Sequence, residues 1–361
     1  MKKILVVDDS ALMRRVLCDI INSDKRFHVE DRATNGLEAF DLLSRKTYDA
    51  VVLDVNMPKM NGIELLKELQ KFKISARVMM ASTATSEGAK VTLDALELGA
   101  VDFIHKPDSA GDCRGDAFKE RLLEVLAVVA ESKAELSVQK VSRPVRREPV
   151  ALPAKKAETP ARALAGVTGR KLVAIASSTG GPKALQSVIP RLPKDLQAPV
   201  LVVQHMPKGF TASLAERLNS LSSVTVREAE EGDVLENGCV YLSMGGRHMN
   251  VTTGASGRYT IHYTDEPPRE GVKPCANYMY ESLGDSRFDE VVCVVMTGMG
   301  ADGTQGISNL KSKKKLQVIA QEQSSCVVYG MPKSIVTAGL ADQIVPLDQI
   351  AQAIIAKVGG K

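Results

Sequence analysis

The chain has 361 residues, of which 44% are hydrophobic and 25% are charged. This length suggests two domains, and the composition excludes collagen-like and wholly disordered chains. The N-terminal apolar run Ile4–Val7 ends in two aspartates and is too short for a signal peptide. No stretch approaches the ~18 apolar residues that span a bilayer. We therefore expect a soluble, cytoplasmic monomer without membrane insertion.

The net charge of +4 at pH 7 comes from one segment. Residues 133–169 contain eight Lys or Arg against three Glu, a local charge of +5, which leaves about −1 for the rest of the chain. The segment has four prolines, seven alanines and no aromatic residue. This composition predicts a flexible basic linker between domains at 1–132 and 170–361. It has none of the features of a nucleic-acid groove, so we expect no nucleic-acid partner.

The cysteines are scattered, with no C-x-x-C pair and no zinc-like spacing. This pattern favours a reducing compartment and small core side chains over disulfides or a metal-thiolate site. The six positions are Cys18, Cys113, Cys239, Cys275, Cys293 and Cys326.

In the first domain, five short apolar strands alternate with amphipathic helices. This alternation predicts an α/β fold with a five-stranded, doubly wound parallel sheet of the flavodoxin-like kind. The first helix is expected to begin after Ser10 as its N-cap. Its apolar face is predicted to contain Leu12, Met13, Val16, Leu17, Ile20 and Ile21. The predicted strands are Ile4–Val7, Phe27–Arg32, Ala50–Leu53, Arg77–Ala81 and Val101–Ile104.

The second domain repeats the alternation and is predicted to be α/β with a mainly parallel sheet. Helical patterns follow Gly181, Gly209, Asp302 and Pro332. The predicted strands are Leu172–Ala176, Pro199–Gln204, Val224–Arg227, Val240–Leu242, Val291–Met296 and Leu316–Ala320.

Polar side chains follow several strands of the first domain. Asp8 and Asp9 follow the first strand, Asp54 the third and Lys106 the fifth. Since the carboxyl ends of parallel strands meet at one edge, these groups are expected to converge there. Crowded carboxylates repel one another unless a hard divalent cation lies among them, which predicts a Mg²⁺ site.

With the Asp-Asp pair, the D-x-x-M-P-x-M-x-G segment at Asp54, Ser82 and Lys106-Pro107, this domain resembles a two-component receiver. The resemblance implies that a histidine kinase partner phosphorylates Asp54. It further implies roles for six other residues: Asp9 as a direct Mg²⁺ ligand with Asp54, Asp8 as a ligand through water, Asn56 as a ligand through its carbonyl, Ser82 as the switch hydroxyl, Lys106 as the phosphoryl-binding cation and Phe103 as the aromatic switch.

Three segments of the second domain carry candidate catalytic groups. Ser178 lies in a Ser-Ser-Thr-Gly-Gly turn after a strand, His205 ends the next strand, and Asp302 follows another. A serine, a histidine and an aspartate at strand ends are the components of a nucleophile, a general base and its orienting carboxylate. Two alternatives stay open: Ser177 as the nucleophile and His248 as the base. No cofactor is expected at this site.

The S-T-G-G, Q-H-M-P, T-G-M-G-x-D-G and S-C-V-V-x-G-M-P segments resemble the catalytic domain of the chemotaxis protein-glutamate methylesterases. The resemblance implies Ser178 as nucleophile, His205 as base and Asp302 as its partner. It also implies Met299 as an oxyanion donor through its backbone N–H and Thr179 as an active-site neighbour. The implied reactions are hydrolysis of glutamate γ-methyl esters on chemoreceptor helices and deamidation of receptor glutamines, both gated by the receiver.

One segment departs from the family. Members commonly carry an R-P-S-V-D-like segment where this chain has Lys273-Pro274-Cys275-Ala276-Asn277. In the family it lies near the expected substrate groove, so the departure is expected to affect receptor specificity and, less strongly, activity. Two other classes of function are alternatives. A non-catalytic adaptor would lack one of the three catalytic residue types, and a transcription regulator would need a DNA-binding output in place of the second βα pattern.

Overall fold

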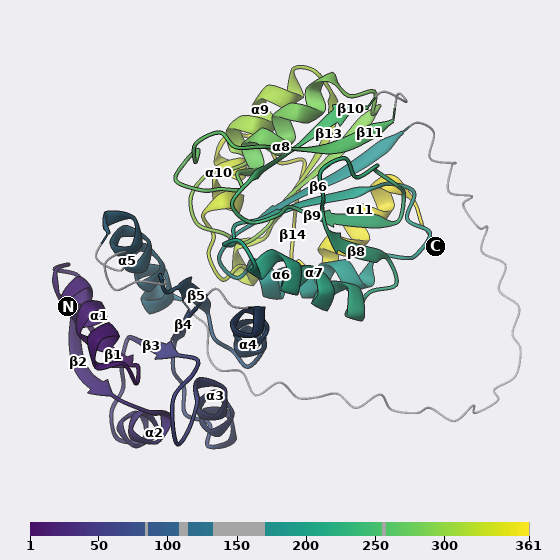
Figure 1. Cartoon of the computed structure of the whole chain (residues 1–361). Coiled ribbons are helices and arrows are strands. Elements are labelled where there is room, and N and C mark those ends of the chain that lie inside the picture. Colours follow the sequence, from purple (N-terminus) through teal and green to yellow (C-terminus); the bar gives the residue numbers. More distant parts are fainter. Residues whose placement is uncertain (84–85, 108–114, 133–169, 255–257, 361) are drawn as a thin grey trace, which may run out of the picture.

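The computed structural model describes residues 1–83, 86–107, 115–132, 170–254 and 258–360. Two α/β domains lie against each other, as Figure 1 shows. The predicted linker at 133–169 and Cys113 lie outside the described residues. Within the described residues, no helix has both the length and the apolar character needed to cross a bilayer.

The first domain contains a five-stranded sheet in the order β2-β1-β3-β4-β5, and every neighbouring pair is parallel. The predicted flavodoxin-like sheet is therefore confirmed. Helices α1 and α5 pack on one face, and α2, α3 and α4 pack on the other. The strands are β1 (Lys2–Val7), β2 (Phe27–Ala33), β3 (Ala50–Asp54), β4 (Val78–Ser82) and β5 (Asp102–His105). The helices are α1 (Ala11–Asn22), α2 (Gly36–Arg45), α3 (Gly62–Lys71), α4 (Ser86–Glu97) and α5 (Asp116–Glu131).

The start of α1 follows the prediction in its cap but not in its whole apolar face. The Ser10 hydroxyl accepts a hydrogen bond from the Met13 N–H at 3.3 Å, as expected of an N-cap. Leu12, however, is 51% exposed, so its predicted place on the buried face was wrong. At about 100° per residue it lies roughly 80° around the helix from Ile20, at the edge of the apolar stripe.

The second domain contains a seven-stranded sheet in the order β14-β13-β12-β6-β7-β9-β8, with parallel neighbours throughout. The predicted mainly parallel sheet is confirmed. Helices α6, α7 and α11 cover one face, and α8, α9 and α10 the other. The helices are α6 (Gly181–Val188), α7 (Phe210–Leu221), α8 (Ala276–Ser282), α9 (Thr304–Lys311), α10 (Met331–Thr337) and α11 (Ile350–Val358). The sheet strands are β6 (Lys171–Ser177), β7 (Val200–Gln204), β8 (Thr225–Glu228), β9 (Cys239–Leu242), β12 (Glu290–Val295), β13 (Lys315–Gln321) and β14 (Gln343–Val345).

An antiparallel hairpin lies beside this sheet, formed by β10 (His248–Thr253) and β11 (Tyr259–Thr264). Strand β10, α8, α11 and β14 were not among the predicted elements, whereas β11 contains His262, which the sequence places in an alternating polar strand.

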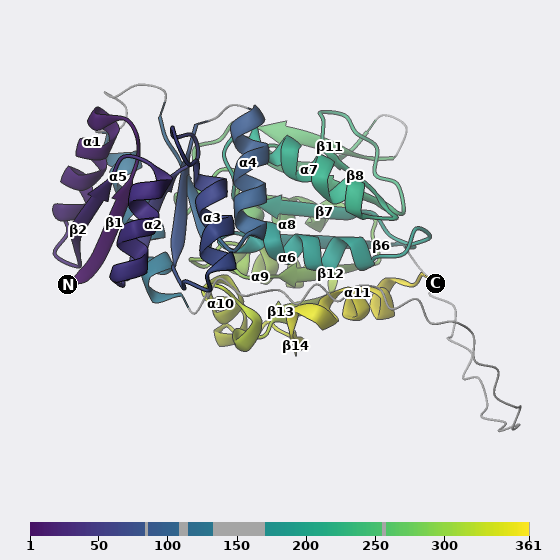
Figure 2. The same ribbon diagram turned by 90° about the horizontal axis from the view of Figure 1, so that it is seen from below.

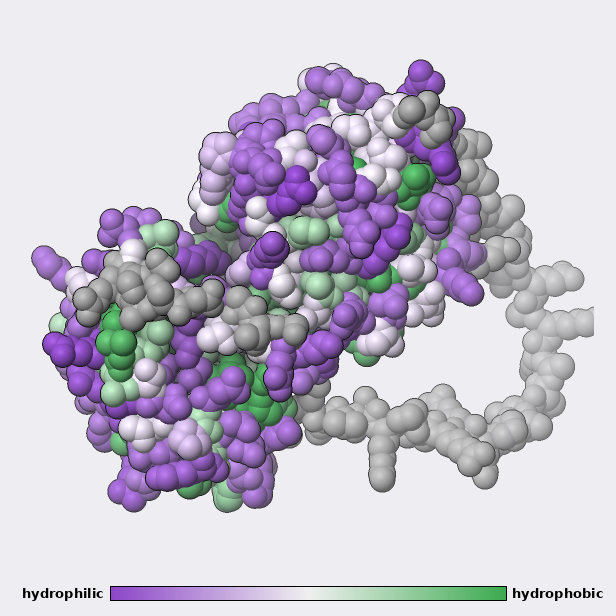
Figure 3. Space-filling model, viewed as in Figure 1, coloured by the Kyte–Doolittle hydropathy of each residue, from purple (hydrophilic) through white to green (hydrophobic). Residues whose placement is uncertain are grey.

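The two domains meet where α4 packs against α6 and α7 (Figure 2). One continuous apolar cluster joins residues of both domains. Elsewhere, the face seen in Figure 3 is mostly hydrophilic, with hydrophobic residues in small separate groups. The domain junction is thus a place where apolar residues of both domains cover one another.

Candidate active site and phosphoacceptor pocket

The sheet of the first domain ends in a buried cluster of opposite charges. Asp8 follows β1, Asp54 ends β3 and Lys106 follows β5. The Lys106 Nζ lies 2.7 Å from Asp54 Oδ1 and 3.1 Å from Asp8 Oδ2. All three residues are under 9% exposed. These three side chains therefore lie together at the carboxyl edge of the sheet, because its parallel strands all end there.

The loop after Asp54 frames this cluster because Gly62 lets it fold back. The Gly62 N–H donates to the Val55 carbonyl at 2.9 Å. A Cβ at Gly62 would lie 2.4 Å from the Asp54 carbonyl oxygen, which excludes any side chain there. Asn61 then begins α3 with a capping box that it shares with Glu64.

The acidic residues of this pocket fit a divalent cation. Asp8, Asp9 and Asp54 each offer a carboxylate oxygen, and these oxygens lie within 4.8 Å of one another. Hard oxygen donors in such proximity are the ligand set that Mg²⁺ takes in phosphoryl-transfer sites. Asn56 lies exposed in the loop beyond Asp54, and Ser82 is buried at the end of β4.

Burial and charge act in opposite directions on the pair at the centre. Burial raises the pKa of Asp54 above its ordinary value, and the Lys106 ammonium offsets only part of that effect. For Lys106, burial disfavours the charged form, but the Asp54 and Asp8 carboxylates outweigh it and raise the pKa. The two carboxylates therefore favour the charged form of the Lys106 ammonium.

In the second domain, the three candidate catalytic residues follow three adjacent strands. Ser178 follows β6, His205 follows β7 and Asp302 lies in the loop after β12, in a sheet ordered β12-β6-β7. The register places Ser177 beside Gln204, so Ser178 and His205 are neighbours at the edge. Backbone hydrogen bonds fix this edge, from Ser178 N to Thr297 O at 3.0 Å and from His205 N to Ser177 O at 3.1 Å.

His205 and Asp302 are directly paired. The His205 Nε2 lies 2.7 Å from Asp302 Oδ2, and the imidazole is only 6% exposed. Nδ1 is left as the ring nitrogen that can serve Ser178. Within the described residues, no hydrogen bond joins Ser178 Oγ to His205, and contacts of this kind commonly tighten only when substrate binds.

The Asp302 carboxylate is ionised despite its burial. Burial alone raises its pKa, but hydrogen bonds and charge from His205, together with hydrogen bonds from the Cys275 thiol and the Ala276 N–H, lower the pKa below its ordinary value. An ionised carboxylate is what orients an imidazole and stabilises its protonated form.

The loop that carries Met299 passes close to Ser178. A Cβ on Gly298 would lie 2.8 Å from the Ser178 Cβ, so only glycine allows this approach. No acceptor in the described part of the chain takes the Met299 N–H. Met299 directly follows Gly298 in this loop, so its N–H is a candidate donor to an oxyanion formed at Ser178. Thr179, 2% exposed, lies next to Ser178 in the turn.

The two alternatives from the sequence have other contacts. The Ser177 hydroxyl is fully buried and donates to Gln204 Oε1 at 2.7 Å, beneath the site. His248 is also buried, and burial lowers its pKa. Its Nε2–H donates to the Pro267 carbonyl at 3.3 Å, and its Nδ1 accepts from the Cys275 N–H at 3.2 Å. The polar atoms of both side chains are thus occupied by other contacts. This favours Ser178 as the nucleophile and His205 as the base.

The first domain covers this site. A cavity of about 370 Å³ is lined by Phe103, His105 and Arg121 from the first domain and by Thr179 and His205 from the second, among others. Phe103 stacks on Phe210 of α7 with ring centroids 4.8 Å apart. Arg217 of α7 pairs with Asp94 and Glu97 of α4. The imidazole of His205 is thus closed in by side chains of the receiver-like domain.

Asp102 is an unusual residue of this cavity. It is 7% exposed, and its Oδ1 accepts the Phe103 N–H at 2.8 Å. Burial raises its pKa, and the nearby Thr179 hydroxyl and Arg121 guanidinium offset this only in part. Thr179 is close enough to lower the pKa but does not have the geometry of a hydrogen bond, so Oδ2 has no partner within the described residues. The contact between the domains therefore contains an incompletely satisfied carboxyl group.

Comparison with known proteins gives the same two units. Residues 173–354 match the CheB methylesterase family, and residues 4–114 match the response regulator receiver domain family. A protein-glutamate methylesterase/protein-glutamine glutaminase of Bacillus subtilis (strain 168) is 43% identical over 98% of this chain and 98% of its own length. A protein of that name from Pyrococcus horikoshii is 42% identical over 99% of this chain and 93% of its own. The crystal structure of the Thermotoga maritima CheB methylesterase catalytic domain is 39% identical, with a TM-score of 0.50 over 52% of this chain and 98% of that one.

Proposed function

Since this chain belongs to the protein-glutamate methylesterase family and carries a response regulator receiver domain, we propose that it is a chemoreceptor methylesterase switched on by phosphorylation of Asp54. The observation that carries the proposal is the 2.7 Å contact between His205 Nε2 and Asp302 Oδ2, beside Ser178 and beneath the receiver. Residues 133–169 are proposed to link the two domains.

In the receiver, Asp54 accepts a phosphoryl group from a histidine kinase. Asp8, Asp9, Asp54 and the Asn56 carbonyl would hold Mg²⁺, directly or through water, and the ion would neutralise charge on the transferring group. Lys106 already lies within 2.7 Å of Asp54 Oδ1 and binds the phosphoryl oxygens. Ser82 is the hydroxyl that turns toward the new phosphoryl group, and Phe103 responds to that movement.

In the esterase, the Ser178 hydroxyl attacks the γ-carbonyl of a glutamate methyl ester, and His205 accepts its proton. The Met299 N–H stabilises the oxyanion. Collapse of the tetrahedral intermediate expels the methoxy group, which takes the proton from His205 and leaves as methanol. Water then attacks the acyl-serine in the same way, releasing the glutamate carboxylate and Ser178. The same steps on a glutamine side chain release ammonia.

Phosphorylation is proposed to open the site by moving the receiver away. A phosphoryl group adds about −1.5 to −2 charges next to Lys106. Phe103 lies on β5, three residues before Lys106, and stacks on Phe210 of the esterase. A movement of Lys106 on phosphorylation can therefore displace Phe103 from the contact between the domains. The adaptor alternative is disfavoured because Ser178, His205 and Asp302 retain an arrangement suited to turnover. The transcription-regulator alternative is disfavoured because the second domain matches a methylesterase family.

Release of radiolabelled methanol from methylated chemoreceptor membranes tests the proposal. We expect methanol release by the full chain to rise when a small phosphodonor and Mg²⁺ are added, because phosphorylation uncovers Ser178. In the Asp54→Asn variant, the phosphodonor should have no effect, because the acceptor carboxylate is gone. Equal stimulation of this variant would contradict the assigned phosphorylation site. If the wild type releases no methanol from any receptor offered, the adaptor alternative replaces the esterase.

The buried Asp102 predicts a pH dependence of the unphosphorylated enzyme. When the receiver is docked, burial raises the pKa of Asp102, whereas after undocking the pKa returns toward about 3.9. The docked state thus binds a proton more tightly, so docking weakens as pH rises from that ordinary value through the raised value. Basal methanol release, divided by the phosphodonor-activated rate at each pH, should rise across this window.

Dividing by the activated rate removes any pH dependence of the catalytic steps, which both forms share. The Asp102→Asn variant should lose the slope, because the amide remains neutral at every pH. Its basal rate at the upper end of the window should be lower than that of the wild type. A slope that persists in this variant would assign the pH dependence to another group, His105 and Arg121 being the other charged or titratable groups of the receiver that line the cavity.

A further inference from the structure

The Asp302 carboxylate is held by four donors. Oδ2 accepts from His205 Nε2 at 2.7 Å and from the Ala276 N–H at 2.6 Å. Oδ1 accepts from the Asn277 N–H at 2.9 Å and from the Cys275 Sγ–H at 3.0 Å. Three of the four donors thus come from one short segment, and Cys275 supplies the only side chain among those three. Because Asp302 is 2% exposed, water cannot substitute for a missing donor.

Cys275 is suited to donate and to do nothing else. It is fully buried, and burial together with the Asp302 charge raises its pKa. The thiol therefore stays protonated, which excludes a nucleophilic role and leaves its S–H as a donor. A donor to an ionised acceptor forms a stronger hydrogen bond than one to a neutral group.

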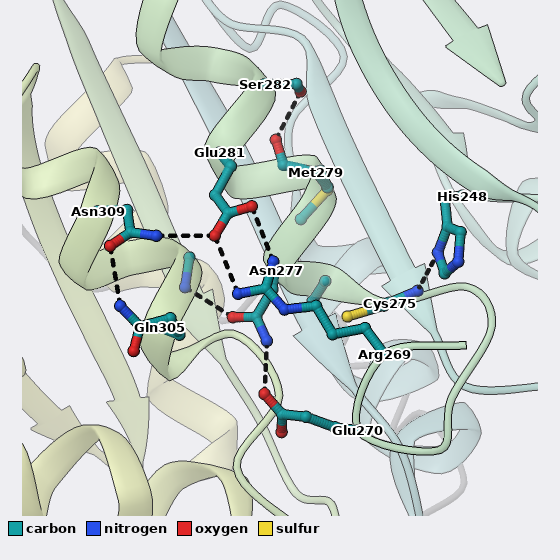
Figure 4. Close-up of polar contacts among 12 residues, drawn as sticks. His248, Arg269, Glu270, Cys275, Asn277, Met279, Glu281, Ser282, Gln305 and Asn309 are labelled. Atoms are coloured by element: carbon teal, nitrogen blue, oxygen red, sulfur yellow. Dashed lines mark hydrogen bonds and ion pairs between the residues drawn. The ribbon is translucent and has the colours of Figure 1, made fainter. Parts of the chain in front are cut away.

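His248 fixes the backbone that carries this thiol. Its Nδ1 accepts the Cys275 N–H at 3.2 Å while its Nε2–H is bound to the Pro267 carbonyl, so the ring is neutral and in a defined tautomer. The Tyr278 ring packs on it with centroids 4.5 Å apart. Figure 4 shows the hydrogen bond between His248 and Cys275.

Asn277 fixes the other side of the same turn. Its Oδ1 accepts the N–H groups of Gly303 at 3.1 Å and Gly306 at 2.6 Å, directly after Asp302. Its Nδ2 donates to Glu270 Oε1 at 2.7 Å, as seen in Figure 4. Residues 274–277 of the departing segment are therefore buried against Asp302, and Cys275 has no exposed surface with which to contact a receptor.

We infer that Cys275 is a positioning residue of the esterase: its thiol holds the Asp302 carboxylate in the orientation that aligns His205 with Ser178. This inference rests on the proposed function of those three residues. A serine hydroxyl can make the same hydrogen bond, whereas an alanine cannot. The departure at this position thus preserves a donor to Asp302.

The test compares Cys275→Ala with Cys275→Ser in the phosphodonor-activated full chain. We expect Cys275→Ala to lower kcat for methanol release about tenfold with KM unchanged, since a lost hydrogen bond to a charged group costs at least that factor. Cys275→Ser should stay within about threefold of the wild type. Cys239→Ala removes another buried thiol of the same domain, outside the site, and controls for loss of packing. Thermal unfolding of all variants shows whether they fold.

A second readout does not depend on turnover. The proton between His205 Nε2 and Asp302 Oδ2 should give a far-downfield proton NMR signal, assigned by its absence in His205→Gln. We expect the signal in the wild type, Cys239→Ala and Cys275→Ser, and its shift or loss in Cys275→Ala. Wild-type kcat and signal in Cys275→Ala, or equal impairment of the Ser and Ala variants, would overturn the inference. If the wild type releases no methanol, the proposed function fails, while the signal still decides the role of Cys275.

Discussion

Replacing Ser178 with alanine is expected to lower methanol release by about 10⁴–10⁶-fold, because the acyl-enzyme can no longer form and the parts of a catalytic triad act as one unit. The variant should fold like the wild type, since the Ser178 Oγ makes no hydrogen bond within the described residues. The measurement is the initial rate of methanol release at saturating phosphodonor, with receptor membranes in excess.

Ser177→Ala is the matched control for this prediction. It removes the neighbouring hydroxyl, which is bound to Gln204 Oε1 beneath the site. Leaving that buried acceptor unpaired should cost about 1–3 kcal/mol of stability, but the nucleophile remains. Its rate should stay within about tenfold of the wild type, because Gln204 Nε2 still holds the Ser178 carbonyl at 2.9 Å. A severe loss in Ser177→Ala together with a mild one in Ser178→Ala would reverse the assignment of the nucleophile.

The Phe210→Ala variant is expected to raise the unphosphorylated esterase rate by about 30-fold, up to the limit set by the activated wild type. Phe210 is fully buried and stacks on Phe103 with an interplanar angle of 22°. Truncation of a buried aromatic residue at the centre of an interface typically costs at least about 2 kcal/mol of binding free energy. A change of this size shifts the ratio of docked to undocked receiver about 30-fold. The phosphodonor should then add correspondingly less.

Two controls separate this effect from general damage. Leu214→Ala truncates a buried core residue of the same helix and should destabilise the domain without raising the basal rate. Arg217→Ala removes the ion pairs to Asp94 and Glu97, whose side chains are 53% and 40% exposed. Such exposed pairs contribute at most about 1 kcal/mol, so the basal rate should rise only a few-fold. An unchanged basal rate in Phe210→Ala would contradict docking through this contact.

The carboxyl edges of both sheets could be predicted because parallel, doubly covered strands leave a clear sequence pattern. Val291–Val295, for example, is a continuous apolar run, as expected of a strand buried on both faces. The first polar residues after such runs lie at the carboxyl edge. This rule was sufficient to predict that Asp8 lies near Asp54 and His205 near Ser178. The order of the strands could not be predicted in this way, since β12 lies beside β6 although β7 to β11 come between them in the chain.

Elements without that pattern were missed. The strand His248–Thr253 has Asn and Thr at alternate positions and, among the described strands, pairs only with its hairpin partner. The helix Ala276–Ser282 begins after Cys275, which makes no side-chain cap, so its start has no signal in the sequence. Gln343–Val345 has only three residues, too few to show a period.

The contact between Cys275 and Asp302 could not be predicted for a different reason. The two residues are 27 positions apart, and only the packing of α8 against α9 brings them together. The sequence showed that Lys273–Asn277 departs from the family and suggested an effect on substrate choice. The direction in which its side chains point decides between a groove residue and a support for the aspartate, and direction depends on the tertiary fold.

Asp102 Oδ2, which has no hydrogen-bond partner in the described part of the chain, lies beside the Phe103–Phe210 stack, and this has a consequence for the proposed signalling. In the proposed docked form, the aromatic stack stabilises the contact between the domains, while the buried carboxyl group destabilises it. In this proposal, the fraction of unphosphorylated molecules with an undocked receiver sets the basal esterase rate. The free energy of docking also sets what fraction of the receivers must be phosphorylated to activate the enzyme. More stable docking would increase the ratio of the activated to the basal esterase rate, but a larger fraction of phosphorylated receivers would then be needed for half-maximal activity. The response to phosphorylation and the basal rate therefore both depend on Asp102, Phe103 and Phe210.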